Sequence, residues 1–145
     1  MILVIDASVA VKWFIEEDRC ELARDVFREG IELVAPDLIF TEVANAMRKK
    51  VRDGEVAMEQ ARNALTGLAN LFNRLVGPRD ILVQSFEFAC EIRHAVPDCV
   101  YLACASIAGA ALLTDDETLF LKAGALKTAV KAMRLRDWTP GLLAK

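Results

Sequence analysis

The sequence predicts an α/β domain built on a parallel sheet. Short apolar runs alternate with helical patterns along the chain, which is the order that successive βαβ units produce. The first run, residues 2–5, is apolar at every position, as in a strand that is buried on both faces. With 145 residues, of which 54% are hydrophobic and 27% charged, the chain can bury one core. We therefore expect one domain over residues 1–145.

The first half of the chain alternates apolar runs with amphipathic segments. Pro36 ends the second apolar run, and the turn at residues 53–54 closes the helical pattern that Asp37 opens. A longer pattern then repeats apolar side chains at helical spacing as far as Gly77. In order, we expect a strand at 2–5, a helix capped by Ser8, a helix at 18–29, a strand at 32–35, a helix from Asp37 to about Arg52 and a helix at 55–76.

The second half continues the alternation. Pro97 and Asp98 open a helix that is rich in small residues, and the apolar run after it ends in Thr114. We expect a strand at 81–83, a helix at 85–95, a helix from residue 97, a strand at 111–114, a short helix near 117–123 and a weaker strand within 128–136. These elements make a twisted, mostly parallel sheet of four to five strands, flanked by helices.

Composition and motifs exclude several classes of function. The net charge of −3, from 18 Lys and Arg against 21 Asp and Glu, does not favour a general nucleic-acid binder. Neither a G-x-G-x-x-G nor a P-loop motif is present. The one histidine, His94, is too few for the usual zinc sites, and its context indicates a surface or helix-capping residue.

The chain carries no signal for a membrane or an export route. No apolar stretch approaches the roughly 20 residues of a membrane span, and no leader pattern opens the sequence. None of the four cysteines belongs to a C-x-x-C pair. We therefore expect a cytoplasmic protein whose cysteines are free, buried thiols.

Acidic residues stand where the predicted strands end. Asp6 follows the first strand, and Asp115 and Asp116 follow the strand at 111–114. Ligands of open parallel sheets bind outside these strand ends, although aspartates there are also ordinary turn and cap residues. Asp98 opens a helix, where a carboxylate also stabilises the exposed N–H groups.

Glu42 is the most informative acid. It falls inside the apolar arc of the helix that Asp37 opens, between Leu38 and Ala46. A carboxylate that faces the interior is costly unless it is paired with a cation or coordinates a metal, so a buried salt bridge is the alternative. Four acids from four elements could then meet at one edge of the sheet. We call them the acidic quartet: Asp6, Glu42, Asp98 and Asp116.

Such a quartet favours a bound divalent cation. Carboxylates without a neighbouring lysine repel one another, and a cation among them removes this repulsion. Ligands that are all oxygens select hard ions, which favours Mg²⁺ or Mn²⁺ over Zn²⁺. Ions held in this way typically serve phosphate chemistry, in which they activate a water and stabilise displacement at phosphorus.

Four sequence motifs carry a resemblance to a known family. They are VIDASV at 4–9 with KWF at 12–14, PDL at 36–38 with TEVANA at 41–46, DCVYLACA at 98–105 and LLTDDETL at 112–119. In this order and spacing they resemble PIN-domain ribonucleases, specifically the VapC toxins of VapBC toxin–antitoxin pairs. The resemblance covers essentially the whole chain and implies a PIN-like fold.

The resemblance implies metal-dependent endonucleolytic cleavage of RNA by the acidic quartet. Asp6, Asp98 and Asp116 would hold Mg²⁺ or Mn²⁺, and Glu42 would complete the shell or position the attacking water. The family's last acid follows a Thr-x-Asp pattern, which selects Asp116 over the adjacent Asp115.

The resemblance also implies supporting residues and partners. Ser8 and Thr114 match small hydroxyl positions that would orient a metal-bound water or a carboxylate, and Asn45 matches a polar position beside the second acid. Family members are often homodimers, and an antitoxin that packs on the helices near the active groove silences them. RNA, an antitoxin and a second copy are therefore the expected partners.

Basic residues near the acids are candidate RNA contacts. Arg48, Lys49 and Lys50 cluster at the end of the Glu42 helix, where they would contact phosphates or form a solvated helix end. Lys12 follows Asp6 along the first helix, either as its electrostatic partner or as a surface lysine.

Three other functions compete with an RNase. A receiver-type signalling domain also gathers aspartates around Mg²⁺, but the predicted strand at 81–83 ends in Gln84 instead of a phosphoacceptor aspartate. A non-catalytic PIN-like module would only bind a partner protein. A metal-dependent DNA nuclease would use similar acids.

Overall fold

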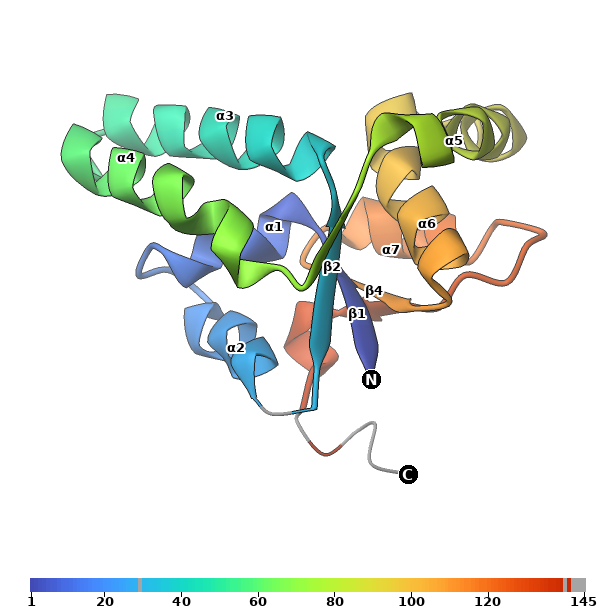
Figure 1. The fold of residues 1–145 in the computed structure, drawn as a ribbon, viewed down its shortest axis with the longest axis horizontal. Helices are drawn as coiled ribbons and strands as arrows, with labels where there is room; N and C mark the ends of the chain where they lie inside the picture. The colour runs from blue at the N-terminus through green and yellow to red at the C-terminus, as the bar shows by residue number, and fades with distance from the viewer. Residues whose placement is uncertain (29, 140, 142–145) are drawn as a thin grey trace.

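The computed structural model describes residues 1–28, 30–139 and 141, and it is built around one parallel sheet (Figure 1). The strands lie in the order β3-β2-β1-β4-β5, and each neighbouring pair is parallel. They are β1 (Ile2–Ile5), β2 (Glu32–Pro36), β3 (Arg74–Val76), β4 (Ala111–Thr114) and β5 (Ala132–Arg134). The predicted fold class is confirmed.

Helices cover both faces of this sheet, with α3 and α4 on one side and α5 and α6 on the other (Figure 1). In the described part of the chain the α-helices are α1 (Ala7–Ala10), α2 (Cys20–Arg24), α3 (Leu38–Arg52), α4 (Met58–Gly67), α5 (Pro78–Ile92), α6 (Val96–Ala108) and α7 (Glu117–Ala123). Single 3₁₀ turns add Val11–Trp13, Asp25–Phe27, Leu68–Leu71 and Leu135–Asp137.

The continuous apolar run of β1 is explained by these two layers. Leu3 and Ile5 belong to the core shared with α3, whereas Val4 belongs to the core shared with α6. Because successive side chains of a strand point to opposite faces, a strand between two helical layers needs an apolar residue at every position. Burial of each such side chain contributes roughly 1.5–3 kcal/mol.

The strand order places a crevice beside the end of β1. The chain runs outward from β1 through β2 to β3 and then returns across the sheet, so that β4 pairs with the other side of β1. The winding direction reverses between these two central strands, and their carboxyl ends are where open α/β sheets bind ligands. This order also differs from the 2-1-3-4-5 order of receiver-type domains.

Two expected elements are wrong. The helix predicted at 55–76 stops in the 3₁₀ turn at Leu68–Leu71, and its last residues form β3, which pairs with β2. The strand predicted at 81–83 lies inside α5, which Pro78 opens from its first turn. A short apolar run does not distinguish a strand from a buried helix segment, and the pairing partner that decides between them is distant in sequence. The receiver-type argument based on residues 81–83 therefore has no structural basis.

Smaller differences concern the helix predicted at 18–29 and the cysteines. That segment forms α2 and a 3₁₀ turn, and residue 29 lies outside the described residues. All four cysteines are free; three are buried as expected, but Cys90 is exposed. None of the helices in the described ranges combines the length and the apolar character needed to cross a bilayer.

Candidate active site

Asp6 lies at the carboxyl end of β1, beside the reversal point of the sheet. It directly follows β1 and is buried, and its Oδ2 accepts hydrogen bonds from the hydroxyls of Ser8 and Thr114, the latter at 2.8 Å. Ser8 was expected to cap the first helix, but Asp6 takes the cap position and the Ser8 hydroxyl binds its carboxylate. Burial raises the pKa of Asp6, the two hydroxyls oppose this shift, and the neighbouring charge of Asp116 adds to it.

Glu42 reaches the same crevice from α3. Its side chain is half-buried, and its Oε2 accepts a hydrogen bond of 2.6 Å from the hydroxyl of Tyr101 on α6. Burial raises the pKa of Glu42, the Tyr101 hydrogen bond lowers it, and the charges of Asp6 and Asp98 raise it further. The interior carboxylate therefore accepts from a neutral hydroxyl and not from the cation that a buried salt bridge would require.

Asp98 lies in the first turn of α6, which Pro97 helps to start. Its Oδ2 is 2.5 Å from Nε2 of His94, which belongs to the short connection between α5 and α6. His94 lies at the end of α5, as expected of a helix-capping residue, and its ring in addition contacts a candidate metal ligand.

The two aspartates after β4 have different environments. Asp115 is bound by Arg19, at 2.9 and 3.0 Å, and lies 3.3 Å from the ammonium of Lys12. Asp116 caps α7 by accepting the backbone N–H of Leu119, and its own N–H donates to the Thr114 hydroxyl. Asp115 is thus neutralised by two cations, whereas Asp116 remains available to the crevice. This arrangement favours Asp116 as the fourth acid.

The acidic quartet is linked electrostatically without closing into a tight cluster. Electrostatic coupling links Asp6 with Asp116 and links Glu42 with both Asp6 and Asp98. Among the described residues, a group of three potential ligands with atoms all within 4.8 Å of one another occurs elsewhere, at Glu16, Cys20 and Glu21. The donors in the crevice are carboxylates and hydroxyls, which fit a hard divalent cation.

The candidate RNA contacts divide into paired and exposed residues. Lys12 is buried and donates to Glu17 and to a backbone carbonyl, and Lys50 donates to Glu17 and Glu55. The expectation of RNA contact at Lys12 is corrected, because the ammonium is enclosed by these acceptors and Asp115. Arg48 and Lys49 are exposed. Arg48 donates to Asn45, and among the described residues Asn45 makes no hydrogen bond to any of the four acids.

Sequence reasoning missed three residues that bind the acids. Tyr101 and His94 contact quartet members, and Arg19 neutralises Asp115. For Tyr101, helical spacing offered a signal, since it lies three residues after Asp98 on the same side of α6. His94 precedes that helix, and only its closeness to Asp98 in the sequence indicated it. Arg19 is 96 residues from its partner, and nothing local indicated it.

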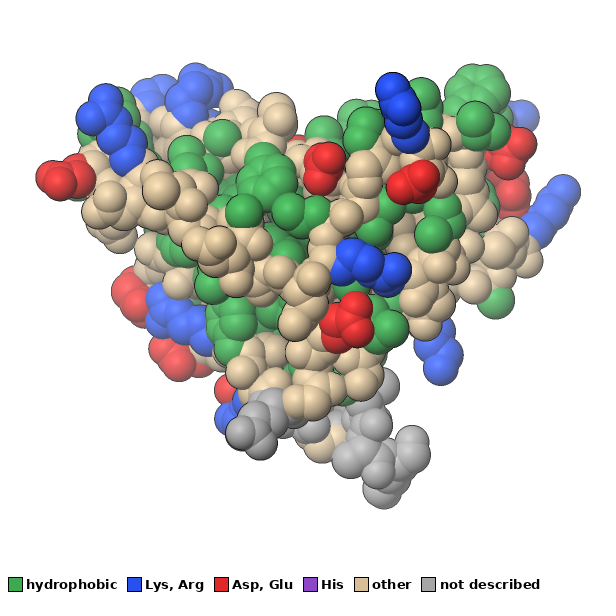
Figure 2. All heavy atoms as spheres, viewed as in Figure 1, with side chains coloured by type: hydrophobic (Ala, Val, Ile, Leu, Met, Phe, Trp, Pro, Cys, Tyr) green, Lys and Arg blue, Asp and Glu red, His purple; other side chains and the backbone are tan. Residues whose placement is uncertain are grey.

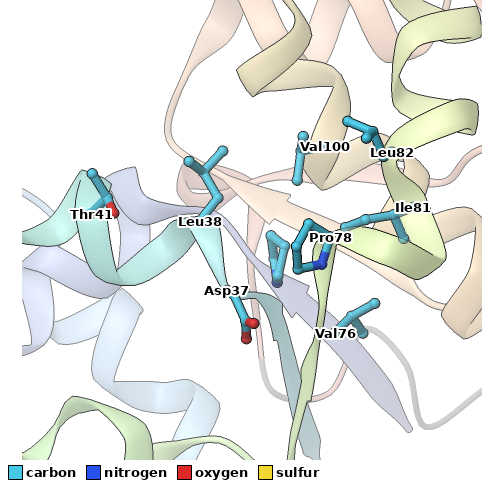
Figure 3. A pocket seen from close by; sticks show the side chains of 9 residues that line it. Asp37, Leu38, Thr41, Val76, Pro78, Ile81, Leu82 and Val100 are labelled. Atoms are coloured by element: carbon cyan, nitrogen blue, oxygen red, sulfur yellow. The ribbon is translucent and has the colours of Figure 1, made fainter.

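An apolar pocket of about 320 Å³ lies beside the site, between the starts of α3 and α5 and the side of α6. Figure 3 shows Leu38, Ile81, Leu82 and Val100 converging on it from these three helices, while Asp37 points away. The molecular surface is indented between α3 and α5 in the space-filling view (Figure 2). Leu82 is itself more than half exposed, so the pocket is continuous with an apolar surface of α5.

Comparison with known proteins agrees with this geometry. The family model of the PIN domain matches residues 3–126. The chain is 35% identical to "Ribonuclease VapC3" of Pyrobaculum aerophilum over 130 residues, which is 88% of this chain and 99% of that protein. It is 31% identical to "Ribonuclease VapC1" of Mycobacterium tuberculosis over 134 residues, 90% of this chain and 97% of that protein.

A solved structure shares the fold. The "Toxin-antitoxin complex from Klebsiella pneumoniae" superposes with a TM-score of 0.63 and 17% identity, covering 89% of this chain and 98% of that chain. The family model spans most of the sequence, and both relatives exceed 30% identity over nearly their whole length. The chain therefore belongs to the PIN-domain family, among its VapC-type members.

Proposed function

We propose that this chain is a metal-dependent endoribonuclease that hydrolyses RNA phosphodiester bonds and acts as the toxin of a toxin–antitoxin pair. The observation that carries the proposal is the electrostatic coupling of Asp6 with Asp116, and of Glu42 with Asp6 and Asp98, beside the reversal point of the sheet. The adjacent Asp115 is instead paired with Arg19 and Lys12. Relatives over 30% identical are named ribonucleases, which supports RNA as the substrate class.

The residues present fit Mg²⁺ or Mn²⁺. Asp6, Asp98 and Asp116 would hold the ion, which supplies an activated water and charge stabilisation at phosphorus. Glu42 would complete the shell or position the attacking water. Ser8 and Thr114 fix the buried Asp6 carboxylate, and a cation would offset the burial and mutual repulsion that raise the pKa values of Asp6 and Glu42.

Exposed cations of α3 would guide RNA toward the acids. Lys49 lies seven residues after Glu42, two helical turns along the same side of α3, and Arg48 is its exposed neighbour. Because the acids repel phosphates, a cationic track beside them would raise the association rate with RNA.

A cleavage assay tests the proposed function. Purified wild type is incubated with single-stranded and structured RNAs, and with DNA of the same sequence, in Mg²⁺, in Mn²⁺ and in EDTA. Asp6→Asn and Asp98→Asn remove candidate ligands, and Asp53→Asn, whose carboxylate pairs with Arg52 at the surface, is the matched control.

We expect cleavage of RNA in the wild type and in Asp53→Asn, with loss in EDTA and in both site variants. Cleavage of DNA but not of RNA would mean that the protein is a DNA nuclease instead of a ribonuclease. Metal-independent cleavage, or full activity in both site variants, would refute the assignment. No cleavage and no Mn²⁺ binding would favour a non-catalytic module that binds a partner protein.

The antitoxin would bind the groove between α3 and α4. This groove, of about 200 Å³, is lined by apolar side chains such as Met47 and Leu65, and the cations Arg48 and Arg62 also line it. An apolar helical segment with acidic residues on its margin complements this lining. Met58→Asp, at an exposed residue of the groove, should weaken binding of an antitoxin selected for suppressing wild-type toxicity, while cleavage by the free toxin persists.

A second copy would cover the exposed apolar face of α5. Leu82, Val83 and Phe86 are all more than half exposed there, next to the apolar pocket of Figure 3. A two-fold interface requires protruding and recessed surfaces on the same patch, and this face supplies both. Sedimentation should show a wild-type dimer and a Phe86→Asp monomer; a monomeric wild type would contradict the dimer.

A further inference from the structure

Side-chain groups contact three members of the acidic quartet, each through one carboxylate oxygen: Oδ2 of Asp6, Oε2 of Glu42 and Oδ2 of Asp98. Oδ1 of Asp116 accepts a backbone N–H instead. In the part of the chain that the structure describes, no side chain donates to the opposite oxygen of any of the four. For Glu42 and Asp98 the donors are Tyr101 and His94, which the proposed chemistry leaves without a role.

Tyr101 is placed to immobilise Glu42. Its side chain is fully buried in the core shared with α6, and its hydroxyl reaches across the edge of the sheet to a carboxylate that α3 supplies from the opposite layer. A glutamate has three rotatable side-chain bonds, so an unheld Glu42 would sample several positions in the crevice. The bond from Tyr101 restricts the carboxylate to one of them.

His94 is placed to immobilise Asp98. Its side chain is 18% exposed, and it lies in the three-residue connection that Arg93 begins in a left-handed conformation, with φ of 50°. The backbone N–H of His94 donates to the carbonyl of Ala89, which fixes the backbone of His94 at the end of α5. The imidazole thereby contacts Asp98 from the connection that precedes α6.

We propose that Tyr101 and His94 are positioning residues that hold Glu42 and Asp98 by one oxygen each and leave the other oxygen of each carboxylate to a divalent cation. Carboxylates that ligate metals commonly depend on such outer hydrogen bonds, whose loss weakens metal binding roughly 10- to 100-fold. The inference rests on the proposed metal-dependent function, and it assigns the two residues a task distinct from contact with RNA.

Binding of Mn²⁺, measured by calorimetry on the full chain without RNA, tests this inference. Tyr101→Phe removes one oxygen and keeps the ring in the core. His94→Ala removes the ring, and His94→Gln restores a donor near the position of Nε2. Ser85→Ala is the matched control, because it also deletes a buried hydroxyl, one that donates only to the carbonyl of Ile81 within α5.

We expect Tyr101→Phe and His94→Ala each to weaken Mn²⁺ binding roughly 10- to 100-fold. His94→Gln should recover most of the affinity, and Ser85→Ala should match the wild type. Thermal unfolding in EDTA is measured for each variant, so that a loss of affinity is interpreted only where the metal-free fold persists. If Tyr101→Phe does not keep the metal-free fold, the inference is tested by comparing the Mn²⁺ affinities of His94→Ala and His94→Gln.

Two failures are distinguishable. A wild type that binds no Mn²⁺ would overturn the proposed metal site and this inference with it. A wild type that binds Mn²⁺ while folded Tyr101→Phe and His94→Ala bind it equally well would overturn the positioning roles alone. Loss of affinity in His94→Ala without recovery in His94→Gln would also contradict the proposed role of the Nε2 hydrogen bond.

Discussion

Ionisation of Asp6 should reduce the stability of the metal-free fold, and Asp6→Asn should remove this effect. Burial raises the pKa of Asp6 above its ordinary value of 3.8, although Ser8 and Thr114 donate to the carboxylate. Between the two pKa values the folded chain keeps a proton that the unfolded chain has released. The resulting stabilisation is fully present below about pH 3.8 and is lost as the pH rises through the pKa of the folded state.

Proton linkage sets the size of the effect. One extra proton bound by the folded state makes the free energy of unfolding fall by at most about 1.4 kcal/mol per pH unit. Asparagine does not ionise, so the difference between the wild-type and Asp6→Asn free energies isolates this slope from the other carboxyls. Urea unfolding in EDTA, from about pH 4 to about pH 8, measures both curves, with Asp53→Asn as the surface control.

We expect the wild type to lose stability relative to Asp6→Asn as the pH rises, and the control to follow the wild type. Addition of Mn²⁺ at the upper end of the range should restore stability to the wild type, by about 2.7 kcal/mol at a hundredfold excess over Kd. Parallel wild-type and Asp6→Asn curves would refute the reasoning, because burial would then leave the Asp6 carboxyl unperturbed.

Three further predictions concern the site and its surroundings. Thr114→Val should lower the free energy of unfolding by about 1–3 kcal/mol in urea, because the buried Asp6 carboxylate and the part-buried Asp116 N–H lose the same hydroxyl; a cost below about 0.5 kcal/mol would contradict this. Asp115→Asn should keep most of the Mn²⁺ affinity while Asp116→Asn loses it in calorimetry, and the reverse order would assign the fourth acid to Asp115. Lys49→Ala should weaken RNA binding at all sequences and reduce the salt slope of log affinity by about 0.7 in filter binding, whereas an unchanged slope would exclude a phosphate contact.

Much of the fold follows from local patterns. Three elements form where their local patterns predict them. They are β1 with its apolar run, the amphipathic α3 with Glu42 inside its apolar arc, and α6 with its small residues. The region from β3 to α5 does not follow its local pattern, because a three-residue edge strand is defined by its partner β2 and not by its own sequence. Its residues continue a helical spacing that tertiary pairing overrides.

The sequence by itself determined the fold class and the four candidate acids, placed at strand ends, at a helix start and on the apolar face of a helix, because strand and helix periodicities and the ends of parallel strands are properties of local sequence. The tertiary structure alone decided which distant residues contact the acids. It neutralised Asp115 with Arg19, enclosed Lys12 and brought Tyr101 to Glu42 across the edge of the sheet. These contacts join residues from different elements, and hydrogen-bond geometry between such elements exists only after the two helical layers have packed on the sheet.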